Sequence, residues 1–235
     1  MLTDAVGEKG YRQIDINLGC PFPMIAGKHK GAGMLLYPAQ VAEVLAPIAE
    51  YPEIQFSLKM RLGWENASEC MVLVELLNTL RLSRIALHAR TGKQQYKGHP
   101  DLEAFQGFYE LCQHPLYYNG DIESLSDIRQ ILTRFPLLKG VFIGRGLLSS
   151  PLLAKEFKGN ETFLPEQRMS IYFAFHEELF SAYSQVLQGE TQLLVKMKTL
   201  WEYFLPETDR KLLKRIKKST RLQQYTESVK AIFTS

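Results

Sequence analysis

Five short apolar runs in this chain each end in a polar cluster, and helical patterns separate one run from the next. Strands that alternate with helices at this spacing pair in parallel through right-handed crossovers. The sequence therefore predicts an α/β fold for the first part of the chain. The runs with their polar ends occupy residues 14–21, 54–63, 84–91, 116–122 and 141–146.

The connections between these runs carry apolar residues at helical spacing. They predict helices over residues 38–51, 67–80, 101–112 and 124–135, the last one capped by Ser124. Residues 2–10 are expected to end a helix at Gly10. Residues 21–33 are rich in Gly and Pro and predict a long flexible connection beside Cys20, which is either a lid or a plain surface loop.

The strand pattern stops after Pro151, and from Glu166 onward only helical periodicity remains. The repeated Phe, Met and Trp residues there are typical of the core of a small helical bundle. His176 lies in one of these apolar stripes and is interpreted as a core histidine. We expect a domain boundary near Gly159, with domains at residues 1–159 and 160–235.

The composition is that of an ordinary globular protein, with 46% hydrophobic and 23% charged residues. No apolar run approaches a membrane span, and the first residues lack the pattern of a signal peptide. The three cysteines, Cys20, Cys70 and Cys112, lack metal-type spacing, and an odd number favours a reducing compartment. We therefore expect a cytoplasmic protein without a bound metal or a membrane partner.

Positive charge is concentrated near the end of the chain. Residues 190–235 contain ten Lys and Arg against five Asp and Glu, a net of +5, whereas residues 1–189 carry −2. Between Arg210 and Arg221 seven cations flank an apolar stripe at Leu212, Leu213 and Ile216, without an acidic residue. This pattern favours a polyanionic partner such as RNA over a merely solvated helix face.

The carboxyl ends of parallel strands meet at one edge of a sheet, where α/β enzymes place their active sites. Lys59 is the cation of an otherwise apolar run, so it is expected to point into a site; a structural ion pair is the alternative. His88 either binds a heterocycle or makes a structural hydrogen bond. Cys20 carries a thiol suited to act as a nucleophile or as a proton donor.

Small residues at two further strand ends suggest an anion pocket. In Gly144-Arg145-Gly146 the glycines permit close approach of backbone N–H groups and the arginine adds a forked charge. Asn119-Gly120-Asp121 is expected to contribute from the neighbouring strand. Each motif alone is weak, and a tight turn is the alternative reading of the glycines.

Taken together and in order, the strand-end motifs resemble those of the tRNA-dihydrouridine synthases. The resemblance covers residues 10–155 closely and the helical part more loosely. It rests on Asn17-Leu18-Gly19-Cys20-Pro21, Lys59-Met60-Arg61-Leu62-Gly63, His88-Ala89-Arg90-Thr91 with Gln94 and Tyr96, Asn119-Gly120-Asp121-Ile122 and Ile143-Gly144-Arg145-Gly146.

The resemblance implies a flavoenzyme in which FMN, reduced by NAD(P)H, passes hydride to a flipped-out uridine of tRNA. It implies a (β/α)8 TIM-type barrel, of which this chain shows strands four to eight, followed by an all-α tRNA-binding domain. Cys20 matches the cysteine that protonates the uridine. The positions that match cofactor-binding residues are Lys59, His88, Asn119, Gly120, Asp121, Gly144 and Arg145.

For RNA, the resemblance points to Asn17 near the target base and to Arg90 and Lys93 along its path. The basic helix adds Lys214, Arg215, Lys217 and Lys218 as expected phosphate contacts. Because a partial barrel has open edges, self-association through those edges is expected. Two alternatives stay open: a non-catalytic RNA-binding remnant of the family, and a flavin oxidoreductase acting on a small pyrimidine.

Overall fold

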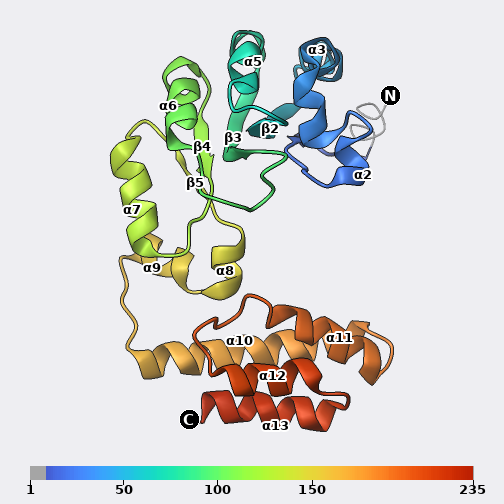
Figure 1. The fold of residues 1–235 in the computed structure, drawn as a ribbon, viewed down its shortest axis with the longest axis vertical. Helices are drawn as coiled ribbons and strands as arrows, with labels where there is room; N and C mark the ends of the chain where they lie inside the picture. Colours follow the sequence, from blue (N-terminus) through green and yellow to red (C-terminus); the bar gives the residue numbers. More distant parts are fainter. Residues whose placement is uncertain (1–8, 235) are drawn as a thin grey trace. The chain divides into compact units, whose positions relative to one another are not determined.

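The computed structural model describes residues 9–234, which form two compact units (Figure 1). The first unit comprises residues 9–121 and Ser126–Ile143, and the second comprises Ile122–Leu125 and residues 144–234. Gly10 lies in a turn with φ of 81°. Most of the helix end predicted over residues 2–10 lies outside the described residues.

The first unit is built on a sheet of five parallel strands. Their order along the sheet follows the chain, so each strand neighbours the next one in sequence. This confirms the α/β class and the parallel pairing predicted above. The strands are β1 (Gln13–Leu18), β2 (Gln55–Gly63), β3 (Leu82–Thr91), β4 (Leu116–Asn119) and β5 (Gly140–Phe142).

Helices connect these strands and lie along one side of the sheet (Figure 1). The helix predicted over residues 38–51 is divided at Ala46, because Pro47 has no N–H group to continue the ladder of the preceding turn. The helices are α3 (Pro38–Leu45), α4 (Pro47–Glu50), α5 (Glu69–Asn78), α6 (Leu102–Leu111) and α7 (Leu125–Arg134).

The two faces of the sheet differ in chemistry. On β2 the side chains of Phe56, Leu58 and Met60 are buried and face the helices, as alternation along a strand requires. Lys59 and Arg61 alternate with these residues along the strand and belong to the opposite face. The sheet register continues this polar face from strand to strand. It thereby brings polar side chains from segments far apart in the sequence next to one another. The paired positions are Asn17 with Lys59, Arg61 with His88, and His88 with Asn119.

The connection after β1 is folded, contrary to the flexible loop expected from its glycines and prolines. It contains α2 (Pro23–Ala26) and a 3₁₀ helix, η1 (Gly31–Leu36). A Cβ atom at Gly33 would lie 2.2 Å from the carbonyl oxygen of Ala26, so only glycine permits this packing. The small residues of the segment therefore serve close packing.

The second unit is helical. In Figure 1 its last four helices lie side by side in the lower part of the view. No helix within residues 9–234 is long and apolar enough to cross a membrane. The helices are α8 (Arg145–Ser149), α9 (Leu153–Gly159), α10 (Pro165–Val186), α11 (Glu190–Leu200), α12 (Arg210–Lys218) and α13 (Leu222–Phe233).

The division between the units falls at Gly144, earlier than the expected boundary near Gly159. The reason is that the segment around α8 and α9 packs with the helical bundle. Leu152 belongs to the bundle core, and the hydroxyl groups of Ser150 and Tyr172 lie 2.7 Å apart. The buried carboxylate of Glu156 also accepts hydrogen bonds from Arg168 of α10.

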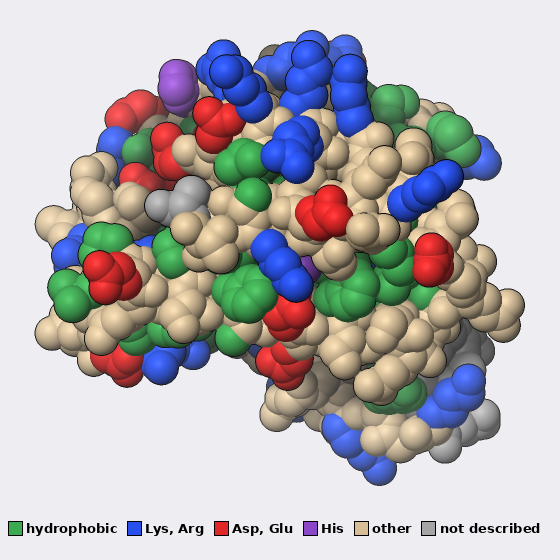
Figure 2. All heavy atoms as spheres, turned by 90° about the horizontal axis from the view of Figure 1, so that it is seen from below, with side chains coloured by type: hydrophobic (Ala, Val, Ile, Leu, Met, Phe, Trp, Pro, Cys, Tyr) green, Lys and Arg blue, Asp and Glu red, His purple; other side chains and the backbone are tan. Residues whose placement is uncertain are grey.

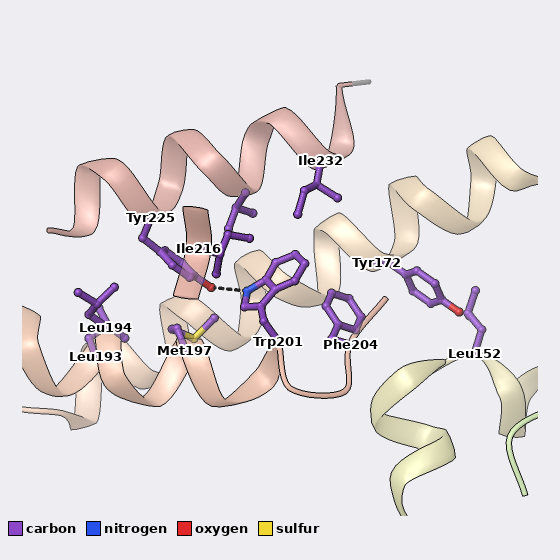
Figure 3. Packing of buried hydrophobic residues seen from close by; sticks show 11 residues of the cluster. Leu152, Tyr172, Leu193, Leu194, Met197, Trp201, Phe204, Ile216, Tyr225 and Ile232 are labelled. Atoms are coloured by element: carbon purple, nitrogen blue, oxygen red, sulfur yellow. Dashed lines mark hydrogen bonds between the residues drawn. The ribbon is translucent and has the colours of Figure 1, made fainter. Parts of the chain in front are cut away.

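The core of the bundle contains a polar chain within its aromatic packing. Figure 3 shows Trp201 and Tyr225 pointing toward each other, and the indole N–H group donates to the tyrosine hydroxyl at 3.0 Å. The same hydroxyl lies 2.6 Å from Nε2 of His176. His176 is 1% exposed, which confirms its interpretation as a core histidine.

Candidate functional site

The polar side chains predicted to act together gather at the carboxyl-terminal part of the parallel sheet. Lys59 and His88 lie on the polar face within β2 and β3, and Cys20 follows the end of β1 by two residues. Because the strands are parallel, their ends lie along one edge. The structure thus brings the thiol, the ammonium and the imidazole to the same end of one sheet.

Lys59 has a half-buried ammonium without a hydrogen bond or ion pair to any residue within 9–234. Burial lowers its pKa, Arg61 lowers it further, and the carboxylate of Asp15 acts in the opposite direction. That carboxylate accepts a hydrogen bond from Ser57 at 2.5 Å. A desolvated cation lacking a partner is suited to hold an electron-rich group of a ligand.

His88 carries a neutral imidazole at physiological pH. Burial lowers its pKa to about 3, with the positive charges of Arg61, Lys59 and Arg90 acting in the same direction. The ring lies 6.3 Å, centroid to centroid, from the ring of Tyr96. A neutral imidazole offers one donor and one acceptor, so it can hydrogen-bond a heterocycle without adding charge.

Cys20 is held by its backbone while its thiol stays half-exposed. The N–H group of Ala32 donates to the Cys20 carbonyl at 3.0 Å. Gly31 has φ of 55°, and a Cβ atom there would lie 2.9 Å from Cβ of Cys20. The returning segment therefore fixes the position of the thiol through backbone contacts.

Arg61 has a structural role that our reading of the sequence missed. Its side chain is 1% exposed, and its nitrogens donate to the carbonyl oxygens of Gly19 at 3.1 Å, Thr91 at 2.8 Å and Gln95 at 2.7 Å. It thus ties the residue before Cys20 to the end of β3. The available signal was an arginine two positions after Lys59, on the same face of a buried strand.

Arg90 was predicted to contact RNA, but its guanidinium is buried. It is 1% exposed and donates to both carboxylate oxygens of Asp121, at 2.7 and 2.5 Å. It also donates to the carbonyl of Gly98 at 2.6 Å. With its donors turned inward, Arg90 positions Asp121 and is not presented to a phosphate.

Asn119 and Gly120 occupy the end of β4. The Asn119 amide donates to the carbonyl of Phe142 at 2.8 Å, which joins β4 to the end of β5. Gly120 has φ of 154°, and a Cβ atom there would lie 2.6 Å from the hydroxyl of Tyr118. Glycine is thus required at position 120 by the backbone conformation, and the absence of a side chain lets the hydroxyl of Tyr118 lie close to the backbone.

Gly144 and Arg145 belong to the second unit, where Arg145 is the first residue of α8. At Gly144 an added Cβ atom would meet open space, whereas at Gly146 it would lie 2.0 Å from the carbonyl oxygen of Ile122. Gly146 therefore lets α8 approach the segment that starts at Ile122. Of the residues predicted for the anion pocket, Gly144 and Arg145 thus belong to the second unit, and Asn119, Gly120 and Asp121 belong to the first.

The remaining residues predicted to contact RNA in the first unit are exposed. Asn17 accepts a hydrogen bond from the Gly19 N–H group at 2.9 Å, which shapes the turn before Cys20. Lys93 pairs with Glu65 at 2.6 Å, and both side chains are solvent-accessible. Such an exposed pair is weak and exchanges readily for another anion.

The predicted basic helix is α12. Ile216 is buried against the bundle, Asp209 caps the first turn, and the cations face outward. Figure 2 shows Lys and Arg side chains gathered on this side of the helical unit. A groove of about 520 Å³ between α12 and α13 is lined by Lys211, Lys214, Arg215 and Lys218. Lys217 is exposed but does not line the groove.

The fold and site define an α/β protein with a strand-end site and an appended basic helical unit. Comparison with known proteins places it more closely. The family model for dihydrouridine synthase (Dus) matches residues 3–234. The chain belongs to the dihydrouridine synthase family.

Individual relatives agree with this assignment. A tRNA-dihydrouridine synthase B of Vibrio vulnificus (strain CMCP6) is 28% identical over 163 residues, covering 68% of this chain and 50% of the relative. A probable tRNA-dihydrouridine synthase of Rhizobium leguminosarum bv. phaseoli is 32% identical over 145 residues, covering 61% and 45%. A tRNA-dihydrouridine synthase B of Vibrio cholerae serotype O1 is 29% identical over 167 residues, covering 69% and 52%. The chain spans about half the length of these curated relatives.

Proposed function

We propose that this chain acts in the reduction of a uridine C5–C6 double bond in tRNA, with FMN as cofactor and NAD(P)H as electron donor. The observation that carries the proposal is the convergence of Cys20, Lys59 and His88 at one end of a parallel sheet in a member of the dihydrouridine synthase family. A basic helical unit follows in the same chain and supplies a surface for the RNA.

The first unit fits the ring end of a flavin. An aromatic ring with electron-rich edge atoms needs donors that are not already engaged. Lys59 offers a half-buried ammonium without a partner within residues 9–234, and His88 offers a neutral donor. We assign Asn119, Gly120 and Asp121, together with Gly144 and Arg145, to the ribityl phosphate of the cofactor.

Bound FMN would supply hydride to C6 of the uracil. The protein must then place a proton on C5, and we assign this step to the thiol of Cys20. The electron pair that hydride addition leaves at C5 forms a C–H bond with the thiol proton. The sulfur keeps the electron pair of the broken S–H bond and is protonated again by water. Contacts of the Cys20 backbone with Ala32 and Gly31 hold the sulfur in place for this transfer.

Arg61 and Arg90 contribute indirectly in this scheme. Arg61 fixes the carbonyl that precedes Cys20, and Arg90 fixes the carboxylate of Asp121. The target base must leave its stack to reach the thiol, and the flanking RNA must be held meanwhile. We assign that task to Lys214, Arg215, Lys217 and Lys218 on α12, with Asn17 near the target base and Lys93 along the path of the RNA.

The architecture that goes with this function is strands four to eight of a TIM-type barrel, followed by a helical tRNA-binding domain that begins near Gly144 instead of at residue 160. Support comes from the parallel order of β1 to β5 and from the polar face opposite the helices. Each edge strand has one neighbour in the described sheet, so we propose that further strands pair there, or that copies of the chain associate.

Spectroscopy and a product assay test the proposal together. The purified chain should show the absorbance of bound flavin, and tRNA incubated with it and NADPH or NADH should contain dihydrouridine by mass spectrometry. A colourless chain that binds tRNA without forming product would select the non-catalytic RNA-binding function. Reduction of a free small pyrimidine, with no effect on tRNA, would select the function of a flavin oxidoreductase acting on a small pyrimidine.

A further inference from the structure

The segment that follows Cys20 displays apolar side chains to solvent. Phe22 is 57% exposed, Met24 70%, Ile25 39% and Leu36 36%. We call these four residues the α2 platform. Three of them lie within four consecutive positions, and exposed large apolar side chains clustered in this way are typical of interaction surfaces.

The backbone beneath the α2 platform is well fixed. The N–H group of Ala26 donates to the carbonyl of Phe22 at 2.9 Å, and that of Lys30 donates to Ile25 at 3.3 Å. Ala26 itself is buried, and Gly33 packs directly against it. The apolar side chains therefore project from an ordered base, and their exposure does not arise from fraying.

Cationic residues lie close to the α2 platform in the chain. Lys28, His29 and Lys30 are exposed on the same segment, and no acidic residue occurs between Asp15 and Glu43. The ring of His29 stacks on that of Tyr37 with centroids 4.2 Å apart. Aromatic and apolar surface interleaved with cations, without acids, matches the chemistry of single-stranded RNA.

We propose that the α2 platform binds the unpaired nucleotides that flank the target uridine, with bases stacked on Phe22 and Met24 and phosphates held by Lys28 and Lys30. The inference rests on the proposed function, because it takes tRNA as the substrate. When one base leaves a stack, its neighbours lose stacking surface. Phe22 lies two residues from Cys20, where those neighbours would come to rest.

A second copy of this chain is the competing occupant. Self-association would bury the apolar side chains but would bring the cations of two copies together, which is unfavourable at low salt. RNA satisfies both components of the surface, and it is therefore the occupant that the charge pattern favours.

The test uses the full chain and a fluorescently labelled tRNA transcript, with binding followed by anisotropy at several salt concentrations. Two double variants divide the platform: Phe22→Ala with Met24→Ala, and Lys28→Ala with Lys30→Ala. Matched controls are Val72→Ala with Leu137→Ala, which are 67% and 76% exposed, and Lys9→Ala with Lys139→Ala. Circular dichroism and retained flavin show that each variant is folded.

We expect the apolar double variant to bind tRNA at least fivefold more weakly with an unchanged salt dependence. The lysine double variant should lower the slope of log affinity against log salt by about 1 to 2. The controls should bind like the parent chain. Parent-like affinity of both platform variants would overturn the inference and leave the proposed function standing.

Two further outcomes separate the alternatives. If the parent chain forms dihydrouridine but its mass falls on dilution, and the apolar variant removes that association without changing tRNA affinity, the platform joins two copies and the RNA inference is wrong. If the parent chain binds no tRNA at any salt concentration, the inference and the proposed substrate fail together.

Discussion

The guanidinium of Arg90 and the carboxylate of Asp121 form a two-point ion pair that joins the end of β3 to the segment after β4, with oxygens at 2.7 and 2.5 Å. The arginine is 1% exposed and the carboxylate 32%. A buried cation that loses its partner retains its desolvation penalty. The pair therefore links the stability of the first unit to the position of a residue assigned to cofactor binding.

Replacement of Asp121 by Asn should lower the free energy of unfolding of the first unit by about 3 kcal/mol. Urea denaturation followed by tryptophan fluorescence, to which Trp64 contributes from the first unit and Trp201 from the second, measures the change. The matched control is Glu65→Gln, which removes the exposed partner of Lys93 and should cost less than about 1 kcal/mol. Equal effects of the two variants would show that the Arg90 pair is effectively solvated.

Replacement of Cys20 by Ala should leave flavin bound and reduce uridine turnover by about 100-fold or more, because general acid catalysis contributes on that scale. Bound-flavin absorbance and single-turnover dihydrouridine formation measure the two effects. Cys112→Ala is the control, since that thiol lies after α6 and bonds to a backbone carbonyl. Unchanged turnover in Cys20→Ala would remove the thiol from the acid role.

Replacement of Lys59 by Met keeps the length of the side chain and removes its charge. We expect flavin affinity to fall about tenfold or more, since a hydrogen bond to a charged group contributes about 1.5 to 3 kcal/mol. Flavin titration of the stripped chain, followed by fluorescence quenching, measures it. Lys139→Met, at an exposed lysine just before β5, should bind flavin like the parent.

His88 should make the first unit sensitive to acid. Its pKa is lowered to about 3 in the folded chain, whereas the unfolded chain has the ordinary value near 6.5. Between these values the unfolded state binds the extra proton, so stability falls as pH falls, by at most about 1.4 kcal/mol per pH unit from this group. Above pH 6.5 the imidazole is neutral in both states and costs no stability. The cost of keeping it neutral in the folded state then grows progressively as the pH falls toward 3.

The comparison of parent and His88→Gln isolates that contribution, because other groups cancel in the difference. Between pH 7 and pH 5 the urea midpoint of the parent should fall more steeply with falling pH than that of His88→Gln. Parallel curves would show that the imidazole is protonated equally in the folded and unfolded chains.

Neutralising the α12 cations should weaken tRNA binding mainly at low salt. With Lys214, Arg215, Lys217 and Lys218 replaced by Gln, the slope of log affinity against log salt should fall by about 2 to 3. Replacing Arg129 of α7 by Gln is the control for the loss of an exposed charge elsewhere. A slope identical to that of the parent would show that α12 does not face the RNA.

The sequence was sufficient to predict the elements that depend on local pattern. Alternation of apolar residues located β1 to β5, and their spacing implied the parallel order, because short α-helical connections permit little else. His176 was recognised as a core residue because it continues the apolar stripe of α10. Periodicity thus conveyed both the class of fold and the inner face of the bundle.

Contacts between distant segments were not predictable in the same way. Arg90 resembled an RNA contact until the structure placed Asp121, 31 positions later, against its guanidinium. Arg61 likewise finds its carbonyl partners on two separate segments, at Gly19 and at Thr91 with Gln95. Glycines in residues 21–33 suggested a flexible loop because a sequence does not distinguish glycine needed for close packing from glycine used for freedom.

The hydrogen bond from the Ala32 amide to the Cys20 carbonyl closes a ring of backbone around α2. Surface loops usually tolerate gain or loss of a residue, because each change alters chain entropy only slightly. Here a single insertion or deletion would pull the sulfur out of line with its neighbours. The length of this segment is therefore part of what places the cysteine, and not only the identity of its residues.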